Sequence, residues 1–354
     1  MWPNNRGEVT IPTPKEGATR EEYMFLFVGP ENETRGYCLN VVIGGKATEY
    51  QIAGLLTEET QRLPPEHLLL AKKKVGIVGL GSVGSKVAVS LARSGVKKFL
   101  LIDDDVMLPD NVCRHELDWI SVGAHKVDSV KEAISLVATD IDIQVRRHRI
   151  GGQESAKDAD TALSGLSSCD ILIDATANSR VFVHLAAIAK RRKRSIIWGE
   201  IFAGGIGGLL IRSRPEKDPP PLVMRSGVND YLDTREPAPF KIASTRYDID
   251  NGDTQPLTAF DADVSQFSAM LTRFAIDTLL DRSPSQFPYS AYLVGFKRNW
   301  IFTEPFDTQP ITINYIANDE TNSHEERNTS DQKTTELLVE LVNQLADDQP
   351  PSTK

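Results

Sequence analysis

The sequence predicts an α/β protein with a Rossmann-like, doubly wound and mostly parallel sheet. First, apolar runs typical of buried strands alternate along the chain with segments whose apolar residues recur at helical spacing. Second, the first such strand is followed by a glycine-rich turn, Gly79-x-Gly81-x-x-Gly84, that opens a helix. Both patterns indicate βαβ units, in which ligands bind outside the carboxyl ends of the strands.

Each predicted element follows from a local pattern. The continuous apolar run "KVGIVGL" (residues 74–80) is typical of a central parallel strand. In residues 82–95 the side chains of Val83, Val87, Ala88 and Leu91 share one helical face, and Gly95 can cap the end. A second helix is expected over residues 125–138, and further strands over residues 97–105, 141–150, 168–176 and 194–201.

Three parts are expected along the 354 residues. Residues 1–70 form an accessory segment with two short strands, in "EYMFLFVGP" and "YCLNVVIGG". The main body runs over residues 71–317. Residues 318–354 are polar and mostly disordered, with a short helix expected at "TELLVELVNQLADD".

Composition excludes several classes of protein. The net charge of −9 argues against a broad nucleic-acid face, and no stretch has the length of a membrane span. The N-terminus lacks the basic-then-apolar order of a signal peptide. Three cysteines, Cys38, Cys113 and Cys169, lie far apart without a CxxC pair, so we expect neither a disulfide framework nor structural zinc. A reducing cytoplasm is the expected location.

The glycine motif predicts a nucleotide site. Its glycines permit a tight turn and close approach of the backbone to phosphate, and the helix N-terminus adds partial positive charge. Asp103 ends the second strand, where a carboxylate can bind ribose hydroxyls. A nicotinamide-dependent oxidoreductase would explain all of these features.

The residues that follow suit a triphosphate better than a dinucleotide. Asn111, Arg114 and Lys126 place fixed polar groups and cations just beyond the second strand, where they can stabilise charge that develops on phosphate oxygens. Asp174 ends a later strand, and a carboxylate beside phosphates suits Mg²⁺. Each residue alone could be an ordinary surface charge or, for Asp174, a helix cap. The ordered set favours a nucleotide triphosphate that is cleaved in the reaction.

With these residues the chain resembles the ThiF/MoeB/ubiquitin-activating enzyme superfamily of adenylyltransferases. The motifs that carry the resemblance are "GLGSVGS", "LIDDDVMLPDNVCRH", "VGAHK" and "DILIDATANSR", and a looser likeness to the ThiF-type C-terminal extension continues through "TAFDADVSQFSAMLTRFAIDTLLD" and "NWIFTEPFDTQPI". The resemblance implies a homodimeric enzyme that uses Mg-ATP to adenylate the C-terminal glycine of a ubiquitin-like or sulfur-carrier protein. It also implies a possible downstream conjugating or protease-type partner.

The same resemblance assigns roles to individual residues. It implies a phosphate loop at Gly79, Gly81 and Gly84, a ribose-binding acid at Asp103 and a second acid at Asp105. It further implies the family's nucleotide-binding Asn-x-x-Arg at Asn111 and Arg114, in which the arginine contacts phosphate. Lys126 corresponds to the catalytic lysine and Asp174 to the magnesium ligand. Arg62 is the candidate for an additional arginine that family members often supply from an N-terminal segment.

The sequence also departs from the family pattern. Many relatives capture the acyl group on a cysteine in a crossover loop, but no cysteine occurs here after Cys169. Cys113, inside the nucleotide motif, could serve or could be a filler residue. The glycines of "GEIFAGGIGG" (residues 199–208) could line a groove for a substrate tail or permit a tight strand pair. Adenylation of a small molecule or tRNA base, an NAD-dependent oxidoreductase and an inactive scaffold remain alternative functions.

Overall fold

The computed structural model describes residues 21–28, 34–41, 47–50, 63–151, 156–202, 204–235 and 259–315. The chain divides into two compact units, residues 1–62 and residues 63–354. The C-terminal helix expected at residues 335–348, the polar tail and Arg62 lie outside the described residues.

The N-terminal unit contains a small antiparallel sheet in the order β1-β2-β3. Its strands are β1 (Glu21–Val28), β2 (Thr34–Val41) and β3 (Ala47–Tyr50). Strands β1 and β2 correspond to the two apolar stretches that the sequence indicates, and β3 is an addition. Residue 63 onward, including the short helix α1 (His67–Leu70), belongs to the second unit.

The second unit is built on a sheet in the order β11-β10-β9-β8-β7-β4-β5-β6. Strands β4 to β8 run parallel to one another, whereas β9, β10 and β11 extend the sheet beyond β8 in antiparallel pairs. The bounds are β4 (Lys74–Val78), β5 (Lys98–Ile102), β6 (Asp142–Arg146), β7 (Ile171–Asp174), β8 (Ser195–Phe202), β9 (Gly207–Ser213), β10 (Ala291–Gly295) and β11 (Thr308–Pro310).

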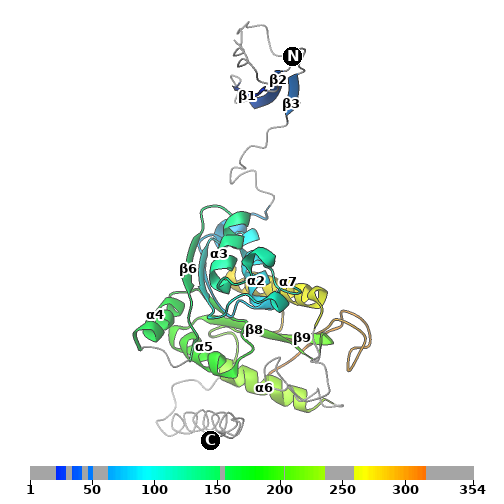
Figure 1. The fold of residues 1–354 in the computed structure, drawn as a ribbon. Coiled ribbons are helices and arrows are strands. Elements are labelled where there is room, and N and C mark those ends of the chain that lie inside the picture. The colour runs from blue at the N-terminus through cyan, green and yellow to red at the C-terminus, as the bar shows by residue number, and fades with distance from the viewer. Residues whose placement is uncertain are drawn as a thin grey trace, which may run out of the picture. The chain divides into compact units, whose positions relative to one another are not determined.

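Helices cover both faces of this sheet, as a doubly wound fold requires (Figure 1). One face carries α2 (Ser82–Arg93), α3 (Lys126–Val137) and α7 (Asp261–Leu279). The other carries α4 (Ala156–Ser167), α5 (Ser179–Arg192) and α6 (Pro221–Asp233). The predicted fold class is confirmed. No described helix has the length and apolar character that crossing a membrane requires.

Local signals in the sequence set the helix ends around the site. Gly95 follows α2 with a φ of +106°, the left-handed conformation expected of a glycine cap. Asn178 caps α5, because its Oδ1 accepts hydrogen bonds from the backbone N–H groups of Arg180 and Val181. Asp174 is therefore not the cap of that helix. Lys193, at the other end of α5, is left-handed with a φ of 50°.

Candidate nucleotide-binding site

The glycine loop joins β4 to α2, and its three glycines serve different physical needs. Gly79 has a φ of +85°, and a Cβ there would lie 2.9 Å from the carbonyl oxygen of Ala175. A Cβ on Gly84 would lie 1.9 Å from the carbonyl oxygen of Gly79, so this glycine lets the helix pack against the loop. A Cβ on Gly81 would meet nothing within 4 Å. The backbone is thus open at Gly81, where phosphate would approach the helix N-terminus.

Asp103 fixes the outer side of this loop. Its Oδ2 accepts a hydrogen bond from the backbone N–H of Leu80 at 2.5 Å, and its Oδ1 accepts one from Asp105 at 2.8 Å. Burial raises the pKa of the Asp103 carboxyl, although these bonds act in the opposite direction. Each carboxylate oxygen can accept a second bond, so the group can hold the loop and still bind ribose hydroxyls.

Lys126 is fixed at the start of α3 by Asp105. The Nζ of Lys126 lies 2.8 Å from Oδ2 of Asp105, and its backbone N–H donates to the Asp105 carbonyl at 3.0 Å. The lysine side chain is 9% exposed and its partner carboxylate 61% exposed. The ammonium group of Lys126 is therefore held in a fixed position near the end of β5, and most of the lysine side chain is shielded from water.

The segment that carries Asn111 and Arg114 is tied to the glycine loop through His115, a contact that sequence reasoning missed. The Nδ1 of His115 accepts from the N–H of Leu117 at 3.1 Å, so its Nε2 donates to the carbonyl of Leu80 at 2.7 Å. Burial lowers the pKa of His115 to about 4, which keeps the ring neutral. Its neighbour Arg114 is half-buried, and the Oδ1 of Asn111 accepts from the N–H of Leu108.

Asp174 lies at the carboxyl end of β7, beside the glycine loop. Its Oδ1 accepts hydrogen bonds from the backbone N–H and the hydroxyl of Thr176, at 3.0 and 2.6 Å. The side chain is 4% exposed, and burial raises the pKa of the carboxyl. No hydrogen bond to Oδ2 occurs among the described residues. That oxygen is available to a cation, as a magnesium ligand requires.

Two further charged side chains lie near Asp174, and sequence reasoning missed both. Glu200 is on β8 and Arg225 is on α6, and the charges of both interact with that of Asp174. In the sequence, Glu200 and Arg225 are a single acid and a single arginine in two elements far apart along the chain. Neither position belongs to a spaced motif, which explains why the sequence did not indicate them.

The glycines around Glu200 are needed for packing. A Cβ on Gly207 would lie 2.5 Å from the carbonyl oxygen of Val294, and one on Gly208 would lie 2.5 Å from the ring of Phe267. Both glycines are buried in β9, where it pairs with β8 and β10. These contacts support the tight strand pair as the reason for the glycines.

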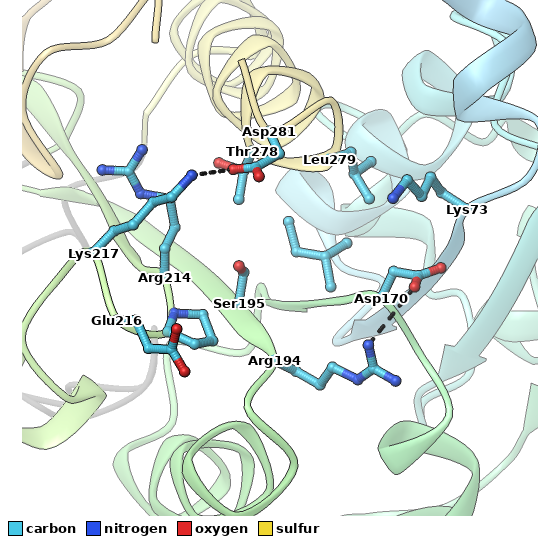
Figure 2. A pocket seen from close by; sticks show the side chains of 12 residues that line it. Lys73, Asp170, Arg194, Ser195, Arg214, Glu216, Lys217, Thr278, Leu279 and Asp281 are labelled. Atoms are coloured by element: carbon cyan, nitrogen blue, oxygen red, sulfur yellow. Dashed lines mark hydrogen bonds and ion pairs between the residues drawn. The ribbon is translucent and has the colours of Figure 1, made fainter. Parts of the chain in front are cut away.

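A pocket of about 340 Å³ lies away from these residues, at the amino ends of the strands (Figure 2). Lys73 precedes β4, Asp170 precedes β7 and Ser195 begins β8. Charges within it are paired, for example Lys217 with Asp281. Ligands of doubly wound folds bind at the opposite edge, so this pocket is not the candidate nucleotide site.

The two described cysteine side chains have no catalytic arrangement around them. Cys113 is exposed, and its Sγ–H donates to the carbonyl of Asp110 at 3.1 Å. Cys169 is buried under the sheet, and burial raises the pKa of its thiol to about 11. A group with that pKa stays a thiol at neutral pH and is a weak nucleophile.

Comparisons with known proteins agree with this geometry. Residues 62–219 match the ThiF family, a range that includes the glycine loop, Asp103, Lys126 and Asp174. This match covers less than half of the 354 residues and describes a ThiF-like region of the chain. The fold of the chain also matches that of MccB from E. coli in a crystal structure with AMPCPP and MccA. The TM-score is 0.52 at 18% identity, over 71% of this chain and 67% of MccB.

Curated relatives match over parts of their length. The chain is 30% identical to the ATP-dependent ubiquitin transferase-like protein Cap2 of Enterobacter hormaechei, over 36% of this chain and 20% of Cap2. It is 26% identical to ubiquitin-like modifier-activating enzyme 5 of Caenorhabditis elegans, over 47% of this chain and 42% of that enzyme. The chain therefore spans less than half the length of these relatives.

Proposed function

We propose that this protein is an ATP-dependent adenylyltransferase that activates the C-terminal carboxylate of a peptide or of a ubiquitin-like or sulfur-carrier protein. The observation that carries the proposal is the set of charges around one glycine loop. Asp103 accepts a hydrogen bond from the loop, and Lys126 is fixed nearby by Asp105. Ala175 and Thr176, which directly follow Asp174, lie against Gly79 of the loop. The oxidoreductase alternative leaves the lysine and the buried strand-end carboxylate without an assigned role.

In the proposed reaction an oxygen of the substrate carboxylate attacks the α-phosphorus of ATP. A new P–O bond forms, the bond between the α-phosphorus and the bridging oxygen breaks, and pyrophosphate leaves with that electron pair. The product is an acyl-adenylate. No general base is required, because the attacking carboxylate is already ionised. Lys126 and Arg114 are cations beside the phosphates and stabilise the negative charge of the transition state.

The proposal includes Mg²⁺, for which Asp174 is the ligand through its open Oδ2. When bound, the ion neutralises charge on the phosphate oxygens. Asp103 and the backbone at Gly81 position the ribose and phosphates of the nucleotide. A terminal glycine on the substrate, a homodimer and a downstream partner belong to the same proposal. The relatives named for ubiquitin transfer and modifier activation support a protein substrate.

Calorimetric titration with Mg-ATP and with NAD⁺ tests the nucleotide assignment. We expect Mg-ATP to bind and NAD⁺ not to bind. Lys126→Met and Asp174→Asn should each weaken Mg-ATP binding by at least about tenfold, because a charge-assisted contact to phosphate or metal is lost. Lys131→Met is the matched control, since Lys131 is exposed on the same helix. Tight NAD⁺ binding without ATP binding would contradict the proposal.

A further inference from the structure

Arg225 is held in a fixed position close to the end of β7. Its guanidinium lies 4.7 Å from the ring centroid of Phe182, and its Nη2 donates to the hydroxyl of Ser179 at 2.8 Å. Ser179 begins α5, directly after the loop that follows Asp174. The stacking and the hydrogen bond therefore orient the planar group next to the proposed reaction centre. Among the described residues, its remaining N–H groups have no hydrogen-bond partner.

Glu200 comes to the same place from β8. Asp174 pairs with Trp198 in the parallel register, so Glu200, two residues further, lies on the same face of the sheet as Asp174. This is the face that α5 and α6 cover (Figure 1). Glu200 is half-buried, and no described residue forms a hydrogen bond with its carboxylate. Burial raises the pKa of this carboxyl, the charge of Arg225 lowers it, and that of Asp174 raises it.

The two groups interact electrostatically but are not an ion pair within 4.0 Å in the described part of the chain. Partly buried charged groups with unsatisfied donors or acceptors are costly unless a ligand satisfies them. A free phosphate would match Arg225 but would be repelled by Glu200. An ammonium group or a metal ion would match Glu200 but would be repelled by Arg225. A neutral group with one acceptor and one donor matches both, and the peptide group has this chemistry.

We propose that Arg225 and Glu200 bind the last peptide group of the substrate's C-terminal tail, with Arg225 donating to its carbonyl oxygen and Glu200 accepting from its N–H. This inference rests on the proposed function, since it places the tail beside Asp174 and the α-phosphate. It makes the substrate class a chain with an amide bond next to its terminal residue. A small carboxylic acid without a hydrogen-bond donor cannot make both contacts.

Two stable mimics of an acyl-adenylate isolate this contact. One is 5′-O-[N-(N-acetylglycyl)sulfamoyl]adenosine, which carries one peptide group next to the acyl carbon. The other is the pentanoyl counterpart, in which CH₂–CH₂ replaces CO–NH. Both are neutral in this part and have the same chain length, so their ratio of Kd values reports the peptide group alone. Calorimetry on the full chain gives both constants.

The wild-type protein should bind the acetylglycyl compound about 10- to 100-fold more tightly than the pentanoyl compound, because two hydrogen bonds to charged groups are gained. Arg225→Met and Glu200→Gln should reduce that ratio by at least about tenfold and about threefold respectively. Affinity for the pentanoyl compound should stay unchanged, which also shows that each variant is folded. Arg235→Met is the matched control, because Arg235 stacks on Tyr231 at 4.3 Å without contacting this site.

The outcomes separate the two proposals. If the wild-type protein binds both compounds equally, or if the variants keep the preference, the role of Arg225 and Glu200 is wrong while the adenylate site stands. If the wild-type protein binds neither compound, the proposed function itself fails, and the role of Arg225 and Glu200 fails with it.

Discussion

Two arginines of this protein lie over phenylalanine rings in similar ways, but they differ in the number of hydrogen bonds that their guanidinium groups donate. Arg212 lies 4.5 Å from the ring centroid of Phe274, and Arg225 lies 4.7 Å from that of Phe182. Arg212 is fully buried and donates to five residues: Asp277, Thr278, Ser285, Phe287 and Ser290. Arg225 donates only to Ser179 among the described residues.

The difference separates a structural charge from one that is available to a ligand. Every N–H direction of Arg212 is used, and its partner Asp277 is 2% exposed, so this network joins β9 to α7 and has no capacity left. Within the part of the chain that the structure describes, Arg225 keeps free N–H groups near Glu200, and the Glu200 carboxylate accepts no hydrogen bond. His115, like Arg212, has both of its hydrogen-bonding atoms used within the protein. In the glycine loop, Gly84 is enclosed by backbone and Gly81 faces free space. Each of these differences can be tested.

The largest effect is expected from removing the saturated arginine. Arg212→Met should lower the free energy of unfolding by roughly 3 to 5 kcal/mol, because it leaves the Asp277 carboxylate buried without its partner. Arg225→Met should change it by less than about 1 kcal/mol. Urea unfolding followed by circular dichroism measures both. Equal losses in the two variants would show that Arg225 is also structural.

His115 should behave as a saturated group and make stability depend on pH. Its pKa is about 4 in the folded protein and 6.5 in the unfolded chain, so the unfolded state gains the proton first as pH falls. The stability is complete above pH 6.5 and declines by about 3 kcal/mol between pH 6.5 and 4.

The readout is the free energy of unfolding at pH 7 and at pH 4.5. His115→Gln should lose most of this decline, whereas His184→Gln, a change of an exposed histidine, should keep it. An unchanged decline in His115→Gln would place the acid sensitivity in other groups.

Two glycines of the loop, Gly84 and Gly81, should differ in whether substitution affects stability or nucleotide binding. Gly84→Ala should cost about 1 to 3 kcal/mol of unfolding free energy, because its Cβ meets backbone. Gly81→Ala should change it by less than about 0.5 kcal/mol, because its Cβ meets open space. Gly81→Ala should nevertheless weaken Mg-ATP binding, since the methyl group occupies the phosphate approach. Unchanged ATP affinity in Gly81→Ala would move the phosphates away from this loop.

The smallest effect is expected between Arg225 and Glu200 in the unliganded protein. A double-mutant cycle with Arg225→Met and Glu200→Gln should give a coupling energy below about 0.5 kcal/mol, because the two groups are not in contact. The coupling is measured from the unfolding free energies of the two single variants and the double variant. A coupling above about 1 kcal/mol would mean that they form a salt bridge without ligand.

Much of this arrangement was predictable from the sequence, because strand-end residues of a parallel sheet meet at one edge. The glycine loop and Asp103 each follow a strand directly and Asp174 is the last residue of one, so the alternation of strands and helices brings them to one edge. His115, Glu200 and Arg225 could not be found in this way. Their roles depend on contacts across elements, such as the bond from His115 to Leu80, that no spacing encodes.

Proline-rich and glycine-rich stretches show the same limit. The composition of "DPPP" (residues 218–221) is typical of an extended linker. Its last proline, Pro221, nevertheless begins α6, where the missing N–H of proline is not needed. The glycines of "GEIFAGGIGG" could indicate a groove or a tight strand pair, and the contacts of Gly207 and Gly208 support the strand pair. Local composition limits the backbone conformations that a segment can adopt, and contacts with the rest of the fold determine which of them forms.

Exchange of labelled pyrophosphate into ATP tests the central claim most directly. Purified protein is incubated with Mg-ATP, labelled pyrophosphate and candidate small proteins that end in glycine. We predict that label enters ATP only when one of these proteins is present, and that Arg114→Ala and Asp174→Ala abolish the exchange. An absence of exchange with every candidate, together with binding of NAD(H) and no binding of ATP, would contradict the account.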